Sequence, residues 1–124
     1  MSEPPKSAFA LLNQLRFVAM RCRVKPRTDL FKACAALHGT RAIERPAYEE
    51  VLMRGLGEAL GQTPKLLAPG TAETTFDEAW LLQLIQAHAS GDTASVRFLL
   101  HSRIAAQHRQ QVLFLIAHAA APNA

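Results

Sequence analysis

Hydrophobic residues recur along most of the chain at the three- and four-residue spacing of amphipathic helices. In the N-terminal half, this spacing predicts one helix over about residues 7–22 and a second that Thr28 or Asp29 caps. A third helix begins near Pro46, which suits a first helical turn, and ends near residue 60. The residues expected to face the core are Ala8, Leu11, Leu12, Leu15, Val18, Ala19 and Cys22, then Leu30, Phe31, Cys34 and Leu37, and then Val51, Leu52, Leu56, Ala59 and Leu60.

The clearest helix start lies at Thr75, where the threonine hydroxyl and the carboxylate of Glu78 match a capping box. The helix that follows reaches about Ala89, and its apolar residues cover more than half of its circumference, which predicts a central position. Asp92 caps a fifth helix, and a sixth spans about residues 105–120.

These elements predict an all-α fold, with residues 1–124 forming a single compact domain of five or six helices. We expect the three C-terminal helices to form an antiparallel unit against which the N-terminal helices pack. Residues 61–74, which contain two prolines and two glycines, are predicted to be a loop between the two halves. Residues 1–6 are expected to be flexible.

Residues 87–100 resemble the paired-helix part of an ankyrin repeat over about half a repeat, through their small residues, the glycine at the turn and the spacing of Val96, Leu99 and Leu100. The Thr-Pro-Leu-His opening of that family is missing, and no second copy follows at the repeat period. We therefore interpret this stretch as an ordinary antiparallel helix pair.

Two observations bear on the location of the protein. The chain has two cysteines, Cys22 and Cys34, and two cysteines do not form a disulfide framework. No hydrophobic signal segment precedes them. No apolar run approaches the roughly 20 residues that cross a bilayer. We expect a cytoplasmic protein that does not insert into membranes.

The net charge of +4 is concentrated in the N-terminal half of the chain. A basic connector near Pro26 gathers four of its cations within seven residues, and a fifth precedes it on the first helix. Such a cluster is typical of binding to phosphates, as in nucleic acids or other polyanions, although runs of charge are more often solvated surface. The candidate anion-binding residues are Arg16, Arg21, Arg23, Lys25 and Arg27.

Cys34 and His38 have the i, i+4 spacing that lets two side chains on one helix bind a metal, and Cys22 is a possible third ligand. No second Cys-His pair completes a four-coordinate site. The competing interpretation is that Cys34 fills a small apolar position on the inner face of its helix.

Catalytic signatures are missing from the sequence, which has no nucleophile elbow, phosphate-binding glycine loop or paired acidic motif. The C-terminal helices carry scattered histidines whose spacing predicts no shared site. These are His88, His101, His108 and His118. We expect no cofactor and favour a function other than catalysis.

Three aromatic residues, Phe17, Phe98 and Phe114, lie off the main apolar stripe of their helices. Exposed aromatic side chains are typical of interfaces, whereas burial on a second helix face is the alternative. The leading hypothesis is a small protein that acts through protein–protein contacts, with a second copy of itself or with another protein partner. The alternative is a regulator that binds nucleic acid or another polyanion.

Overall fold

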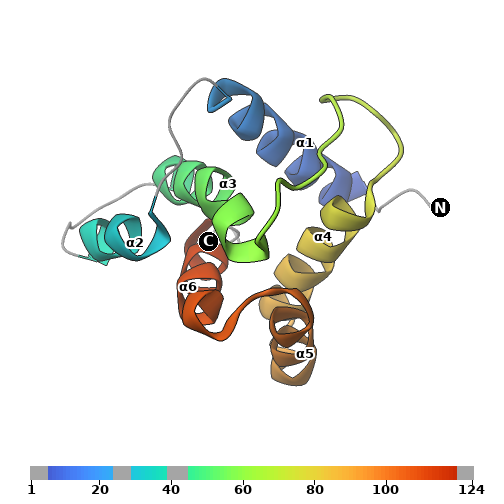
Figure 1. Cartoon of the computed structure of the whole chain (residues 1–124). Helices are drawn as coiled ribbons and strands as arrows, with labels where there is room; N and C mark the ends of the chain where they lie inside the picture. Colours follow the sequence, from blue (N-terminus) through green and yellow to red (C-terminus); the bar gives the residue numbers. More distant parts are fainter. Residues whose placement is uncertain (1–5, 24–28, 39–44, 120–124) are drawn as a thin grey trace.

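The computed structural model of the protein describes residues 6–23, 29–38 and 45–119, and within these ranges every regular element is helical. The elements in chain order are α1 (Lys6–Arg21), α2 (Leu30–His38), α3 (Arg45–Leu60), α4 (Phe76–Ala89), α5 (Thr93–Arg103), the 3-10 turn η1 (Ala106–His108) and α6 (Arg109–Ala119). Figure 1 shows α2 at the left and α5 at the bottom of the molecule, with α6 between them and α3 above α6. The all-α fold of five or six helices predicted from the sequence is confirmed.

Side chains at the start of three helices satisfy backbone N–H groups that have no partner within the helix. Asp29 and Asp92 each accept a hydrogen bond at 3.0 Å from the amide three residues further on. At α4, the Thr75 hydroxyl accepts from the Glu78 amide at 3.1 Å, and the Glu78 carboxylate accepts from the Thr75 amide at 3.0 Å. This is the predicted capping box. Thr28, the other candidate cap of the second helix, lies outside the described residues.

The hydrophobic core draws on every α-helix. The most extensive helix contact joins α3 to α6, and the next joins α4 to α5, which form the predicted antiparallel pair. The last helix, α6, contacts α4 of the C-terminal group as well as α2 and α3, so the N-terminal helices pack against the C-terminal ones as the sequence predicts. Core side chains with at most 2% exposure include Leu52 and Leu56 of α3, Leu81 and Leu84 of α4, and Leu115 and Ile116 of α6.

The predicted loop is present as residues 61–75, which contain no helix or strand. In Figure 1 this segment runs from the end of α3, past α1, to the start of α4. Its backbone is tied to α1, because Gly70 N–H donates to Asn13 Oδ1 at 2.9 Å. The loop is therefore part of the packed structure of the N-terminal half.

The predicted core faces are largely correct, with one clear exception. Phe31 was expected to face inward, but it is 70% exposed. The buried residues of the nine-residue helix α2 are Leu30, Cys34 and Leu37. These three positions form a narrow stripe, and Phe31 lies beyond its edge.

Two further predictions concern the membrane and the N-terminus. None of the helices in the three described ranges combines the length and the apolar character needed to cross a bilayer. The N-terminal segment that was expected to be flexible falls outside the described residues except for Lys6, with which α1 begins.

Candidate functional site

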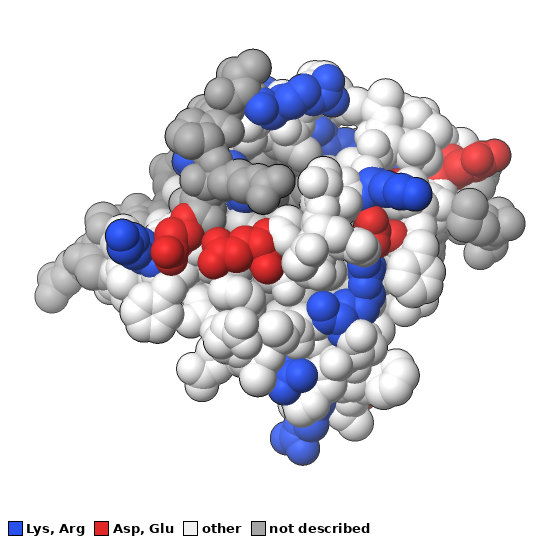
Figure 2. Space-filling model, in the orientation of Figure 1, with Lys and Arg blue, Asp and Glu red and all other residues white. Residues whose placement is uncertain are grey.

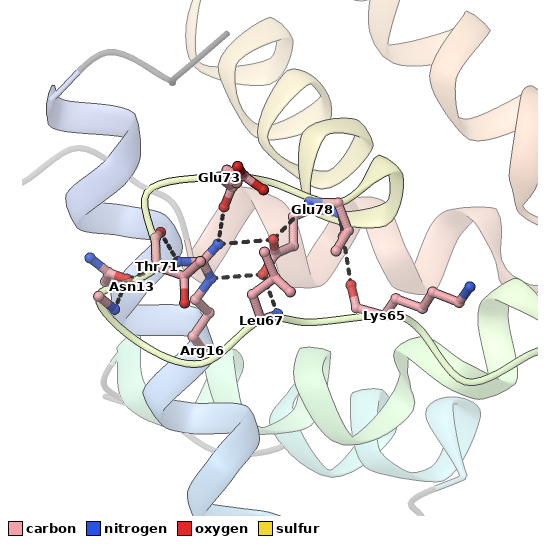
Figure 3. Close-up of polar contacts among 9 residues, drawn as sticks. Asn13, Arg16, Lys65, Leu67, Thr71, Glu73 and Glu78 are labelled. Carbon is pink, nitrogen blue, oxygen red and sulfur yellow. Dashed lines mark hydrogen bonds and ion pairs between the residues drawn. The ribbon is translucent and has the colours of Figure 1, made fainter. Parts of the chain in front are cut away.

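A buried ion pair lies at the centre of the polar contacts between α1, the 61–75 loop and α4 (Figure 3). Arg16 Nε donates to Glu78 Oε2 at 2.7 Å, and Arg16 Nη2 donates to Glu78 Oε1 at 2.9 Å. The other guanidinium hydrogens reach Asn13 Oδ1 at 3.2 Å and the carbonyl oxygens of Thr71 and Glu73, each at 2.8 Å. A guanidinium has five N–H donors, and all five are used here.

The carboxylate of Glu78 is equally well satisfied. Besides the two bonds from Arg16, it accepts from the backbone amides of Leu67 at 2.9 Å and Thr75 at 3.0 Å. Burial alone raises the pKa of this carboxyl group, but the hydrogen bonds from Arg16, Thr75 and Leu67 outweigh burial and hold the pKa of Glu78 below its ordinary value. Glu78, which belongs to the capping box of α4, thus also fixes the loop that precedes this helix.

A second carboxylate extends this network toward α5. Asp77 Oδ2 accepts from the Lys65 amide at 2.7 Å, and Asp77 Oδ1 lies 2.6 Å from Arg103 Nη1. Burial raises the pKa of Asp77, but the bonds from Lys65 and Arg103 hold it below its ordinary value. The Arg103 guanidinium also lies over the rings of Phe76 and Trp80, 5.2 and 5.4 Å from their centroids. These groups bind one another, so we interpret the network as structural.

Acid should destabilise the protein through these two carboxylates. Because their pKa values are lower in the folded chain than in the unfolded chain, their stabilising contribution is full above the unfolded pKa and is lost as pH falls through the folded pKa. We expect the thermal midpoint to fall between about pH 6 and about pH 3. In Asp77→Asn the fall should be smaller by a few degrees. An equal fall in this variant would contradict the role assigned to Asp77.

The predicted anion-binding residues do not form one accessible group. Arg16 is 2% exposed and uses every guanidinium donor inside the protein, so it is removed from the candidate set. Arg21 and Arg23 are exposed. Lys25 and Arg27 lie outside the described residues. On the upper and middle parts of the face in Figure 2, basic and acidic side chains are interspersed and form no continuous basic surface among the described residues.

The predicted metal ligands are not brought together. Cys22 and Cys34 are both buried and form no disulfide bond, and Cys34 Sγ lies 4.0 Å from the carbonyl oxygen of Gln111. His38 is exposed at the end of α2, where its ring stacks on Phe114. Among the described residues, no group of three or more His, Cys, Asp or Glu side chains is placed to hold a metal ion. Cys34 instead fills an inner position of α2, which was the competing interpretation.

The three aromatic interface candidates differ in their surroundings. Phe17 and Phe98 are exposed by 51% and 70%. Phe114 is half-buried, with its ring centroid 4.0 Å from that of His38 and 4.6 Å from that of His118. Tyr48 contacts the edge of the same cluster. Phe114 is therefore covered by α2 and α3 of its own chain, as the alternative interpretation of these residues held.

Phe17 belongs to a surface patch on α1. Met20 lies one turn further along α1 and is 45% exposed. Beside Phe17, a hollow of about 350 Å³ separates α1 from the start of α3 and is lined by Gln14, Arg21, Pro46 and Glu49 as well as Phe17. We call Phe17, Met20 and the lining of this hollow the α1 face.

A buried carboxylate helps to join the two helices of the α1 face. Glu49 is 1% exposed, and Gln14 Nε2 donates to its two carboxylate oxygens at 3.1 and 3.3 Å. Arg45 Nε lies 3.7 Å from Glu49 Oε2. Because side chains from both helices fix Glu49, the walls of the hollow are held by the fold itself.

Comparisons of the chain with protein-family models, with curated protein sequences and with solved structures find no match. The functional argument therefore starts from the α1 face. Sequence reasoning identified Phe17 from its position off the apolar stripe. It missed the hollow, because Gln14 and Glu49 are 35 residues apart and meet only in the folded chain.

Proposed function

We propose that this protein acts by protein–protein contact, and that it self-associates through the α1 face. The observation that carries the proposal is the neighbouring pair of exposed apolar side chains, Phe17 and Met20, beside a preformed hollow. Exposing such side chains to water is unfavourable, and covering them stabilises a complex.

A second copy of the chain suits this patch better than an unrelated partner. A two-fold dimer uses the same patch on both subunits, so the patch must complement itself. The α1 face has a projecting ring, Phe17, next to a hollow of about 350 Å³ that is large enough to receive a side chain. In a two-fold arrangement, each copy would supply the ring that enters the hollow of the other.

Two of the other exposed rings, Phe76 and Phe98, offer less to a partner. The guanidinium carbon of Arg103 lies over the ring of Phe76, 5.2 Å from the ring centroid. Phe98 projects from the face of α5 opposite Val96 and Leu100, among small and polar residues such as Ser102. An isolated aromatic side chain on a surface is common and needs no partner.

Binding of a polyanion stays the alternative, with Arg21 and Arg23 as its described residues. A cytoplasmic location likewise stays a prediction, which the burial of two cysteines without a disulfide bond supports. Nothing in the described residues points to a reaction, so the proposal is a function without catalysis.

Light scattering tests the proposal through the mass in solution. We expect the wild-type protein to have twice the mass of one chain, at both low and high salt, because apolar contacts are not screened by ions. Phe17→Ser should reduce the mass to that of a single chain and leave the helical circular dichroism unchanged, since the side chain is on the surface. Phe98→Ser is the matched control and should remain dimeric.

Other outcomes of this experiment are decisive as well. A wild-type monomer, or a dimer that survives Phe17→Ser, would overturn the assignment of the α1 face. Adding a fluorescent duplex DNA to the same samples tests the alternative function, which is polyanion binding. A complex that forms only at low salt and is lost when Arg21 and Arg23 are replaced by Gln would favour polyanion binding.

A further inference from the structure

A groove of about 520 Å³ lies where the end of α4, the length of α5 and the start of α6 meet. Its floor is apolar. Ala87, Val96 and Leu100 are buried core residues, and Leu113 is a half-buried residue packed against the same core. The volume falls within the range of about 300–1,000 Å³ that is usual for small-molecule sites. None of these floor residues belongs to the α1 face.

The rim of the groove is basic. His88, Arg97 and His101 each follow a floor residue directly in the sequence and so stand about 100° further round the same helix. Arg109 lies one turn before Leu113 on α6 and completes the rim. Among the described residues that line the groove there is no Asp or Glu.

One of the two arginines of the rim is held in place by the backbone. Arg109 Nε donates to the carbonyl oxygen of Ile104 at 2.9 Å, which anchors the guanidinium beside the groove. Arg97 is exposed on α5 and is able to turn toward a ligand. In the lower part of Figure 2, where Figure 1 places α5, the visible charged atoms are mainly those of Lys and Arg.

We propose that this groove binds a small amphipathic carboxylate, with its hydrocarbon part on the apolar floor and its carboxylate at the basic rim. An apolar floor alone does not discriminate among hydrophobic ligands. The arginines supply the selectivity, because a guanidinium forms charge-assisted hydrogen bonds with a carboxylate and repels a cation. This site does not depend on self-association, because it lies on helices that the α1 face does not use.

Calorimetric titration with three ligands of equal chain length tests the proposal. Decanoate, decanol and decylamine share the same hydrocarbon and differ in the charge of the head group. We expect one decanoate to bind per chain, decanol to bind about tenfold more weakly, and decylamine to show no measurable binding. Light scattering on the same samples reports the mass, so a failure of dimer formation is seen separately from a failure of ligand binding.

Variants locate the bound ligand. Arg97→Gln should weaken decanoate binding about three- to tenfold and leave decanol binding unchanged. Leu113→Trp, which places a large side chain on the floor, should abolish binding of both. Arg54→Gln, at a cation that pairs with Glu50 on α3, is the control and should bind as the wild type does.

Three results would overturn the proposal. They are the absence of decanoate binding to the wild type, equal binding of decanoate and decylamine, and decanoate affinity that neither Arg97→Gln nor Leu113→Trp changes. Circular dichroism confirms that each variant is folded before it is titrated.

Discussion

Replacing Arg16 by Met should lower the free energy of unfolding by about 3–5 kcal/mol, because the carboxylate of Glu78 would stay buried without its counter-ion. The substitution also removes the donors that satisfy the carbonyl oxygens of Thr71 and Glu73. Urea unfolding followed by circular dichroism measures the change, and the midpoint should fall without a change in the dependence on urea concentration.

Arg97→Met provides the matched control for this prediction. It is the same chemical change at an arginine that is exposed on α5, and we expect an effect within about 0.5 kcal/mol. If Arg16→Met costs no more than this control, the guanidinium of Arg16 does not carry the network of contacts described here.

A double variant separates the charge pair from its wider network. Replacing a buried ion pair by apolar residues is often harmless, because no charge is then left buried. Here Arg16→Met combined with Glu78→Leu would still leave the amides of Leu67 and Thr75 without their acceptor. Since an unpaired buried backbone group costs about 1–3 kcal/mol, we expect a loss of at least about 2 kcal/mol to remain. Full recovery would show that the pair stabilises the protein only through its charges.

The difference between local and distant contacts explains what the sequence reveals of this network. The capping box was predicted from four consecutive residues, because Thr75 and Glu78 meet within one helical turn. The partner of Arg16 lies 62 positions away, and no spacing rule connects them. The available signal was weaker, namely that Arg16 sits one turn after Leu12 at the edge of an apolar stripe, where a cation is unusual unless it is paired.

The same reasoning applies to the aromatic residues. The core faces of α1 and α6 follow from helical periodicity, but a second contact depends on where neighbouring helices lie. Phe114 is off the stripe of α6 and is nonetheless covered, because α2 packs on that side. Phe31 was assigned to a core face and is exposed, because the nine-residue helix α2 buries only a narrow stripe. Periodicity predicts which face of a helix is turned to the core, but it carries no information about whether a second face is also buried by a neighbouring helix.

The basic groove was beyond sequence analysis for a related reason. Each of its three helices contributes only one or two floor residues and one or two basic residues at the rim, and no contribution is distinctive by itself. The histidines at 88 and 101 were seen in the sequence as scattered residues. They line the same groove only because α4 packs antiparallel to α5 with α6 beside them.

Leu115→Ala should lower the free energy of unfolding by about 3–5 kcal/mol, a second effect of the largest size expected for a single substitution in this chain. Leu115 is completely buried on α6, the helix whose most extensive contact is with α3. Truncation leaves a cavity between elements that are fixed on both sides, so the surroundings are unable to collapse into it. Thermal and urea unfolding measure the loss.

Leu113→Ala is the matched control, since it makes the same change two residues earlier on the same helix. Leu113 is half-buried on the floor of the groove, where solvent or neighbouring side chains can occupy the space, so we expect a loss of about 1 kcal/mol. Because the chemical change is the same at both positions, the ratio of the two losses reports how completely each side chain is enclosed by the core. Equal losses would contradict the placing of Leu115 in the fully buried core, whereas a much larger loss at Leu115 follows from its enclosure on every side.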